Sequence, residues 1–211
     1  MINKWLLSEG NITDGIVREV VRNIVTLIKK GQEGRSYLPE DITDGEKFEY
    51  EFKNVPEFSV ELIFSFETNI DNEYQLDART VDDGFVIEII LKVNPKFYPQ
   101  SMYDIIGDLN EIVAHEIEHL YQESGKRPHS ELDTHQGSIE TRPTGKEYYL
   151  QPHEVPAQLK GFKRLKDIKK DPIEKTIRDW FYRNRSVNNL NDQDIEELTN
   201  FLVQKYKERY S

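Results

Sequence analysis

Four segments rich in β-forming residues follow one another between residues 47 and 93, and no gap between them has room for a helix. The segments are KFEYEFKN, SVELIFSFE, EYQLDART and GFVIEIILKV. Turn-forming residues separate them: Pro56, then Asn69 to Asn72, then Asp82, Asp83 and Gly84. Because parallel βαβ units need long crossovers, these short gaps favour an antiparallel meander. Alternating acidic residues would then line its solvated face.

Helical patterns stand on both sides of this region. Residues 14–30 carry apolar side chains at helical spacing and end at Lys29, Lys30 and Gly31. A second apolar helical repeat runs from Ile105 to Leu120, after a start resembling a capping box at Ser101 and before Gly125. Beyond it, we expect a long polar loop over residues 123–150 that borders any functional site. Further helices are expected at about 153–169, 172–184 and 192–210.

These patterns predict an α+β fold. An N-terminal helix and an antiparallel sheet pack on the helix that ends near residue 125, and a C-terminal helical part follows. We divide the chain into residues 1–125, the N-terminal α/β part, and 126–211, the loop and C-terminal helices. The length of 211 residues suits one compact unit made of both parts.

Composition narrows the classes of function. The chain has no cysteine, so disulfides, thiolate metal sites and cysteine nucleophiles are excluded. The net charge of −11 is concentrated between residues 40 and 90, which hold 15 acidic and 3 basic residues, so nucleic acid is an unlikely partner there. A basic stretch at 156–185 is expected to be a solvated face. The start MINKWLLSEGN resembles no signal peptide and no long apolar segment follows, so we expect a cytoplasmic protein without a membrane partner.

The most specific motif is HEIEH at residues 115–119. On a helix, residues four apart share one face, so His115 and His119 can direct two imidazole nitrogens at one metal ion. Glu116 is rotated by about 100° from His115, which places its carboxylate beside the metal as a base. Glu118 is expected to be a solvated helix residue. The alternative is an ordinary helix with two histidines, but its apolar side implies burial against the sheet.

A catalytic metal needs a third protein ligand. The chain has Gln122 and Gly125 where the HExxHxxGxxH pattern has Gly and His, so that arrangement is excluded. Glu154 lies 35 residues past His119, and Pro156 places it near the start of a helix. We predict Glu154 as the third ligand. The rivals left open are His153, His129, His135, Glu140 and Glu147.

With HEIEH and the segment Pro152-His153-Glu154-Val155-Pro156-Ala157, the chain resembles the gluzincin-type zinc metallopeptidases, including small phage and bacterial members. The resemblance covers residues 99 to about 165. It implies a zinc ion held by the two histidines and a glutamate from a later helix. Gln158 departs from larger gluzincins, which often have an aspartate at this position that supports a zinc histidine.

The function expected from this resemblance is hydrolysis of a protein or peptide substrate, with zinc as cofactor and Glu116 as general base. Tyr148 or Tyr149 would stabilise the developing oxyanion, and Tyr149 is our candidate catalytic residue. A phage-encoded enzyme would act in the host cytoplasm. Two alternatives remain: a regulatory protease for one protein partner, and a non-catalytic binding protein with an acidic sheet surface and a structural or absent metal. An acidic DNA mimic is disfavoured because the acidity is confined to one segment.

Overall fold

In the described part of the chain, one long helix comes first, four consecutive strands follow it, and the remaining elements are helices. The computed structural model describes residues 4–30, 43–50, 57–70, 72–81, 86–97, 102–123, 145–185 and 188–210. The strands in this part are β1 (Thr43–Tyr50), β2 (Phe58–Phe66), β3 (Tyr74–Val81) and β4 (Val86–Val93). The helices are α1 (Lys4–Lys30), α2 (Met102–Glu123), α3 (Lys146–Tyr149), α4 (Glu154–Lys169), α5 (Ile173–Asn184) and α6 (Asp192–Tyr210). The predicted α+β class is confirmed.

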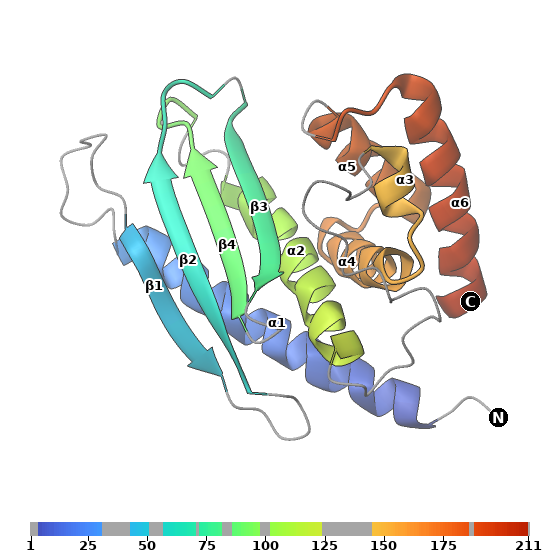
Figure 1. Ribbon diagram of the computed structural model, residues 1–211, viewed down its shortest axis with the longest axis horizontal. Coiled ribbons are helices and arrows are strands. Elements are labelled where there is room, and N and C mark those ends of the chain that lie inside the picture. Colours follow the sequence, from blue (N-terminus) through green and yellow to red (C-terminus); the bar gives the residue numbers. More distant parts are fainter. Residues whose placement is uncertain are drawn as a thin grey trace.

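The sheet has the strand order β1-β2-β4-β3, which differs from a meander. The pairs β1–β2 and β3–β4 are antiparallel, as expected. However, β2 and β4 pair in parallel, from Ser59 opposite Val86 to Phe66 opposite Val93. The prediction of an antiparallel meander is therefore wrong at this pair, because β4 lies between β2 and β3 (Figure 1).

Burial explains this order. Strand β4 has five buried residues among its eight, whereas β3 alternates half-buried and exposed residues and has none buried. An apolar strand is best covered with a partner on each edge, and a more polar strand tolerates the edge position. The side chain of Asn94 helps to hold the β2–β3 connection, since its Nδ2 donates to the carbonyl of Ile70 at 3.3 Å.

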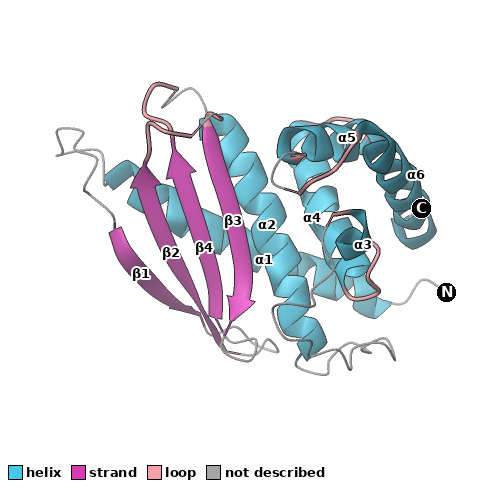
Figure 2. Ribbon diagram, turned by 45° about the horizontal axis from the view of Figure 1, so that its top comes forward, coloured by secondary structure: helices cyan, strands magenta, loops and turns pink. Residues whose placement is uncertain are grey.

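One face of the sheet packs on α1 and α2 (Figure 1). The main core consists of residues from these two helices and from the strands, including every predicted core position of α1 whose side chain is described. Helix α1 begins at Lys4, ten residues before the predicted start. The opposite face of the sheet carries no helix among the described residues (Figure 2). None of the helices in the described ranges combines the length and apolarity needed to cross a bilayer.

The C-terminal helices form a second hydrophobic cluster on the far side of α2 (Figure 1). Phe162 of α4, Phe181 of α5 and Leu198 of α6 are fully buried within it. Helix α4 packs closely on α2 where Gly161 meets Glu111: a Cβ at Gly161 would lie 2.5 Å from Glu111 Oε1 and 3.0 Å from its backbone oxygen. This contact brings the N-terminal half of α4 close to the HEIEH segment of α2.

Candidate metal centre

His115 and His119 lie one turn apart on α2 and face the same point. Their Nε2 atoms are 3.0 Å apart. His115 is buried, with 6% of its surface exposed, and the His119 side chain is 14% exposed. The helical spacing that the sequence predicts therefore places two imidazole nitrogens side by side in a nearly dry environment.

Glu154 reaches the same point from the first turn of α4. Its Oε2 lies 3.3 Å from His115 Nε2, and its Oε1 lies 3.6 Å from His119 Nε2. One ligand atom from each of the three residues falls within 4.8 Å of the others, so the group could hold a metal ion. The structure thus brings together the three residues predicted as metal ligands.

Gln122 orients His119. The Nδ1 atom of His119 is 3.1 Å from Gln122 Oε1, and the Gln122 amide nitrogen donates to the carbonyl of His153 at 3.0 Å. Because the amide oxygen can only accept, this contact places a proton on Nδ1, and Nε2 is then the nitrogen that would bind a metal ion. Gln122 also ties α2 to the residue before Glu154, so one side chain supports two of the three candidate ligands.

The electrostatics of the group fit a cation. Burial alone would lower the pKa of His115, but nearby carboxylates, chiefly Glu154, outweigh it and raise this pKa to about 9. Burial alone would raise the pKa of Glu154, but hydrogen bonds from three imidazoles hold it well below its usual range. With Glu116 beside them, two carboxylates are buried next to neutral or singly charged imidazoles, and a divalent cation would balance them.

Glu116 lies at the edge of this group, as its position next to His115 implies. Its Oε1 is 3.9 Å from His115 Nε2, and its Oε2 accepts a hydrogen bond of 2.7 Å from the Thr80 hydroxyl of β3. Only 5% of Glu116 is exposed. The carboxylate therefore has one oxygen held by the sheet and one oxygen on the side of the histidines.

The two candidate tyrosines of α3 occupy different surroundings. Burial, together with a hydrogen bond to Glu154 and the nearby charge of Glu116, raises the pKa of Tyr148 far above its usual range. Tyr149 instead packs edge-on against Trp180 and Phe181 in the second cluster. We prefer Tyr148 over Tyr149 as a hydroxyl donor at the site, because the Tyr148 hydroxyl is hydrogen-bonded to Glu154.

Of the rival ligands, one lies at the rim of the group, one is exposed on α3 and three are outside the described residues. His153 Nε2 is 3.5 Å from Glu154 Oε1, at the rim of the group, and Glu147 is exposed on α3. His129, His135 and Glu140 lie outside the described residues. The expectation of a solvated Glu118 is wrong, since it is 1% exposed and accepts from Arg209 of α6 at 3.4 Å.

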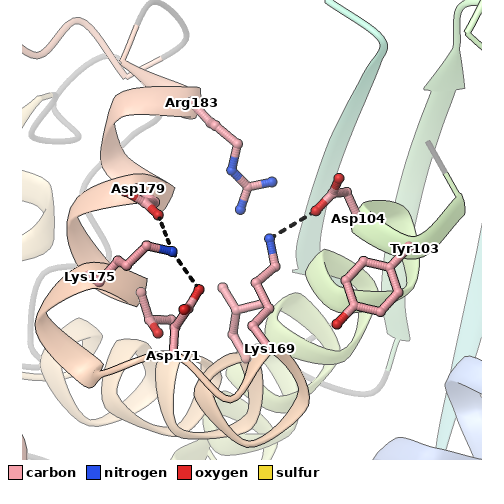
Figure 3. Close-up of a pocket in the computed structure, with 9 residues that line it drawn as sticks. Tyr103, Asp104, Lys169, Asp171, Lys175, Asp179 and Arg183 are labelled. Atoms are coloured by element: carbon pink, nitrogen blue, oxygen red, sulfur yellow. Dashed lines mark hydrogen bonds and ion pairs between the residues drawn. The ribbon is translucent and has the colours of Figure 1, made fainter. Parts of the chain in front are cut away.

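A separate pocket lies between the start of α2 and helices α4 and α5 (Figure 3). Its charged residues pair with one another: Lys169 with Asp104, and Lys175 with Asp171 and Asp179. The Arg183 guanidinium at this pocket binds Asp108 of α2. None of the three candidate metal ligands lines it, so it is distinct from the candidate metal centre.

Sequence reasoning did not assign roles to Thr80 or Gln122. The sequence does contain a signal for Thr80. Leu76 and Ala78 face the core, and alternation along the strand places the polar Thr80 on this same side. Gln122 stands three residues after His119, on the same side of the helix. Neither signal identifies a partner without the tertiary structure.

No protein-family model, curated protein or solved structure matches this chain. Its functional interpretation therefore rests on the geometry of the centre.

Proposed function

We propose that this protein is a zinc-dependent metallopeptidase in which His115, His119 and Glu154 bind the metal. The observation that carries the proposal is the buried group of two imidazoles and one carboxylate, with a further carboxylate directly beside it. This donor set is typical of catalytic zinc, which takes three protein ligands and keeps one position open. The resemblance of HEIEH and the Glu154 segment to gluzincin peptidases agrees with this ligand set.

When bound, zinc would supply Lewis acidity toward a substrate carbonyl and toward water. The residues of the chain then have separate roles. Glu116 accepts the proton of the attacking water at Oε1, the oxygen on the side of the histidines, and passes it to the leaving amine. Tyr148, whose hydroxyl faces Glu154, donates a hydrogen bond to the developing oxyanion. The low exposure of the group limits competing water.

The first test combines metal content with peptidase activity. Untagged wild-type protein, purified without chelator, should contain about one zinc ion per chain by elemental mass spectrometry and should cleave a mixture of unstructured peptides. Glu116→Gln should keep the zinc and lose activity by roughly 10²- to 10⁴-fold, since it removes only the base. His115→Ala and Glu154→Ala should lose the metal.

Glu147→Gln is the matched control, because Glu147 is an exposed glutamate of α3 outside the group. It should keep both zinc and activity. Wild-type protein that takes up no zinc, or a Glu116→Gln variant as active as wild type, would contradict the proposal. Zinc retained in Glu154→Ala would point to another third ligand, and bound iron in place of zinc would indicate a different chemistry for the same donor set.

A further inference from the structure

Thr80 interrupts the apolar side of β3. Tyr74, Leu76 and Ala78 lie on the side of the strand that packs against the main core, and alternation places Thr80 on the same side. Thr80 pairs with Ile87 of β4, so its backbone position is set by the sheet. Its hydroxyl meets Glu116 of α2 at 2.7 Å, which is a short bond to a nearly buried carboxylate.

This bond constrains how the Glu116 carboxylate is oriented. With Oε2 held by Thr80, Oε1 is the oxygen that lies 3.9 Å from His115 Nε2. A glutamate side chain has several rotamers, and one strong hydrogen bond selects among them. We propose that Thr80 is a positioning residue for the general base, which keeps Oε1 directed at the metal-binding group. This inference rests on the proposed peptidase function and adds a residue from the sheet to it.

The same strand contacts α2 at a second, independent point. At its other end, the Tyr74 hydroxyl donates to Asp108 Oδ2 of α2 at 2.5 Å. Two hydroxyl to carboxylate bonds thus join the same strand to the same helix, at Asp108 and at Glu116. The bond at Asp108 lies about two helical turns from Glu116 on α2. The bond from Thr80 contacts the Glu116 carboxylate directly.

The test is Thr80→Val, which keeps the shape and removes the hydroxyl, beside Thr80→Ser, which restores it. In zinc-loaded protein we expect Thr80→Val to lower kcat by about 10- to 100-fold, with KM and zinc content unchanged. Thr80→Ser should stay close to wild type. Tyr74→Phe is the matched control: it removes the equivalent bond to Asp108 and should leave kcat unchanged.

A second measurement uses neither metal nor activity. In chelator-treated protein, Thr80→Val should lower the thermal unfolding midpoint by roughly 3–10 °C, because a buried carboxylate loses its donor. The same substitution in a Glu116→Ala background should cause no such loss. A general packing role for Thr80 would lower the midpoint equally in both backgrounds.

The outcomes separate this inference from the proposed function. If wild type is an active, Glu116-dependent peptidase and Thr80→Val keeps its kcat, the positioning role is overturned and the function stands. Loss of zinc or a raised KM with unchanged kcat in Thr80→Val would also overturn it. If zinc-loaded wild type has no Glu116-dependent activity, the proposed function fails and the positioning role fails with it, even if the unfolding experiment shows coupling.

Discussion

Buried acidic residues on α2 each meet a partner from another element. Asp108, Glu111 and Glu116 are at most 7% exposed. Their partners are Arg183 and Tyr74 for Asp108, Trp180 for Glu111, and Thr80 for Glu116. A buried carboxylate is costly unless it is paired, hydrogen-bonded or neutral. Asp108 is paired with the guanidinium of Arg183, whereas Glu111 accepts a hydrogen bond of 3.2 Å from the neutral indole N–H of Trp180.

For Glu111 this difference predicts a pH dependence of stability. Burial is the main reason that its pKa rises from 4.5 to about 7. The folded state therefore binds more protons than the unfolded state between these values, and the free energy of unfolding falls as pH rises through this window. The loss attributable to this group is on the order of 3 kcal/mol.

Glu111→Gln should remove this dependence, because the amide does not titrate and can still accept from Trp180. In urea unfolding of chelator-treated protein, the stability of the variant relative to wild type should increase as pH rises from 4.5 to about 7. Stability curves that stay parallel over this range would contradict the assignment.

At the scale of elements, the contact between α2 and α4 decides whether the three candidate ligands meet. Gly161 is two turns after Glu154 on α4 and lies against Glu111 of α2. The lack of a side chain at this point allows the close approach of the two helices. Gly107 of α2 also faces α4, but the nearest atoms there are the flexible ends of Leu165 and Lys169 at 3.4 Å.

Gly161→Ala should therefore separate α4 from α2. The added methyl would overlap both the side chain and the backbone of Glu111, and overpacking of this kind costs about 1–3 kcal/mol. The shift should also weaken zinc binding, because Glu154 moves away from the histidines. Thermal unfolding and zinc titration measure the two effects.

Gly107→Ala is the control for this substitution. Its methyl would make ordinary contacts, and alanine favours the helix by up to about 1 kcal/mol over glycine. We expect unchanged or slightly higher stability and unchanged zinc affinity. Equal losses in both alanine variants would show that the Gly161 contact has no special part in the site.

At the scale of the whole molecule, the candidate metal-binding group lies between two hydrophobic clusters. The histidines belong to α2, which packs in the sheet cluster, and Glu154 begins α4, which packs in the C-terminal cluster. A ligand that binds only when both parts are folded and docked stabilises the folded chain as a unit.

Zinc should therefore raise the unfolding midpoint of the whole chain. At a free zinc concentration of about 100 times the dissociation constant, the gain is about 2.7 kcal/mol, or roughly 5–10 °C for a chain of this size. Differential scanning calorimetry with and without zinc measures the shift. The same zinc addition should not shift the midpoint of His115→Ala, and an equal shift there would indicate binding elsewhere.

Local features could be predicted from the sequence to a large extent. The helices at 154–169, 173–184 and 192–210 lie within a residue of their predicted bounds, because apolar spacing and terminal residues are local signals. The short helix α3 was not predicted, since it has four residues and no apolar repeat. The strand order was also not predicted. Alternation of apolar and polar residues shows which face of a strand is buried, but not which other strand it pairs with.

The sequence by itself determines that His115 and His119 share one helix face with Glu116 beside them, because helix geometry sets these positions within about one turn. The sequence names Glu154 and Tyr148 as candidates, but only the tertiary structure places them beside the histidines, and it alone brings in Thr80. Each comes from a different element, and their approach depends on the insertion of β4 between β2 and β3 and on the close packing at Gly161. These contacts between distant segments arise from burial of the whole chain, which local sequence patterns do not encode.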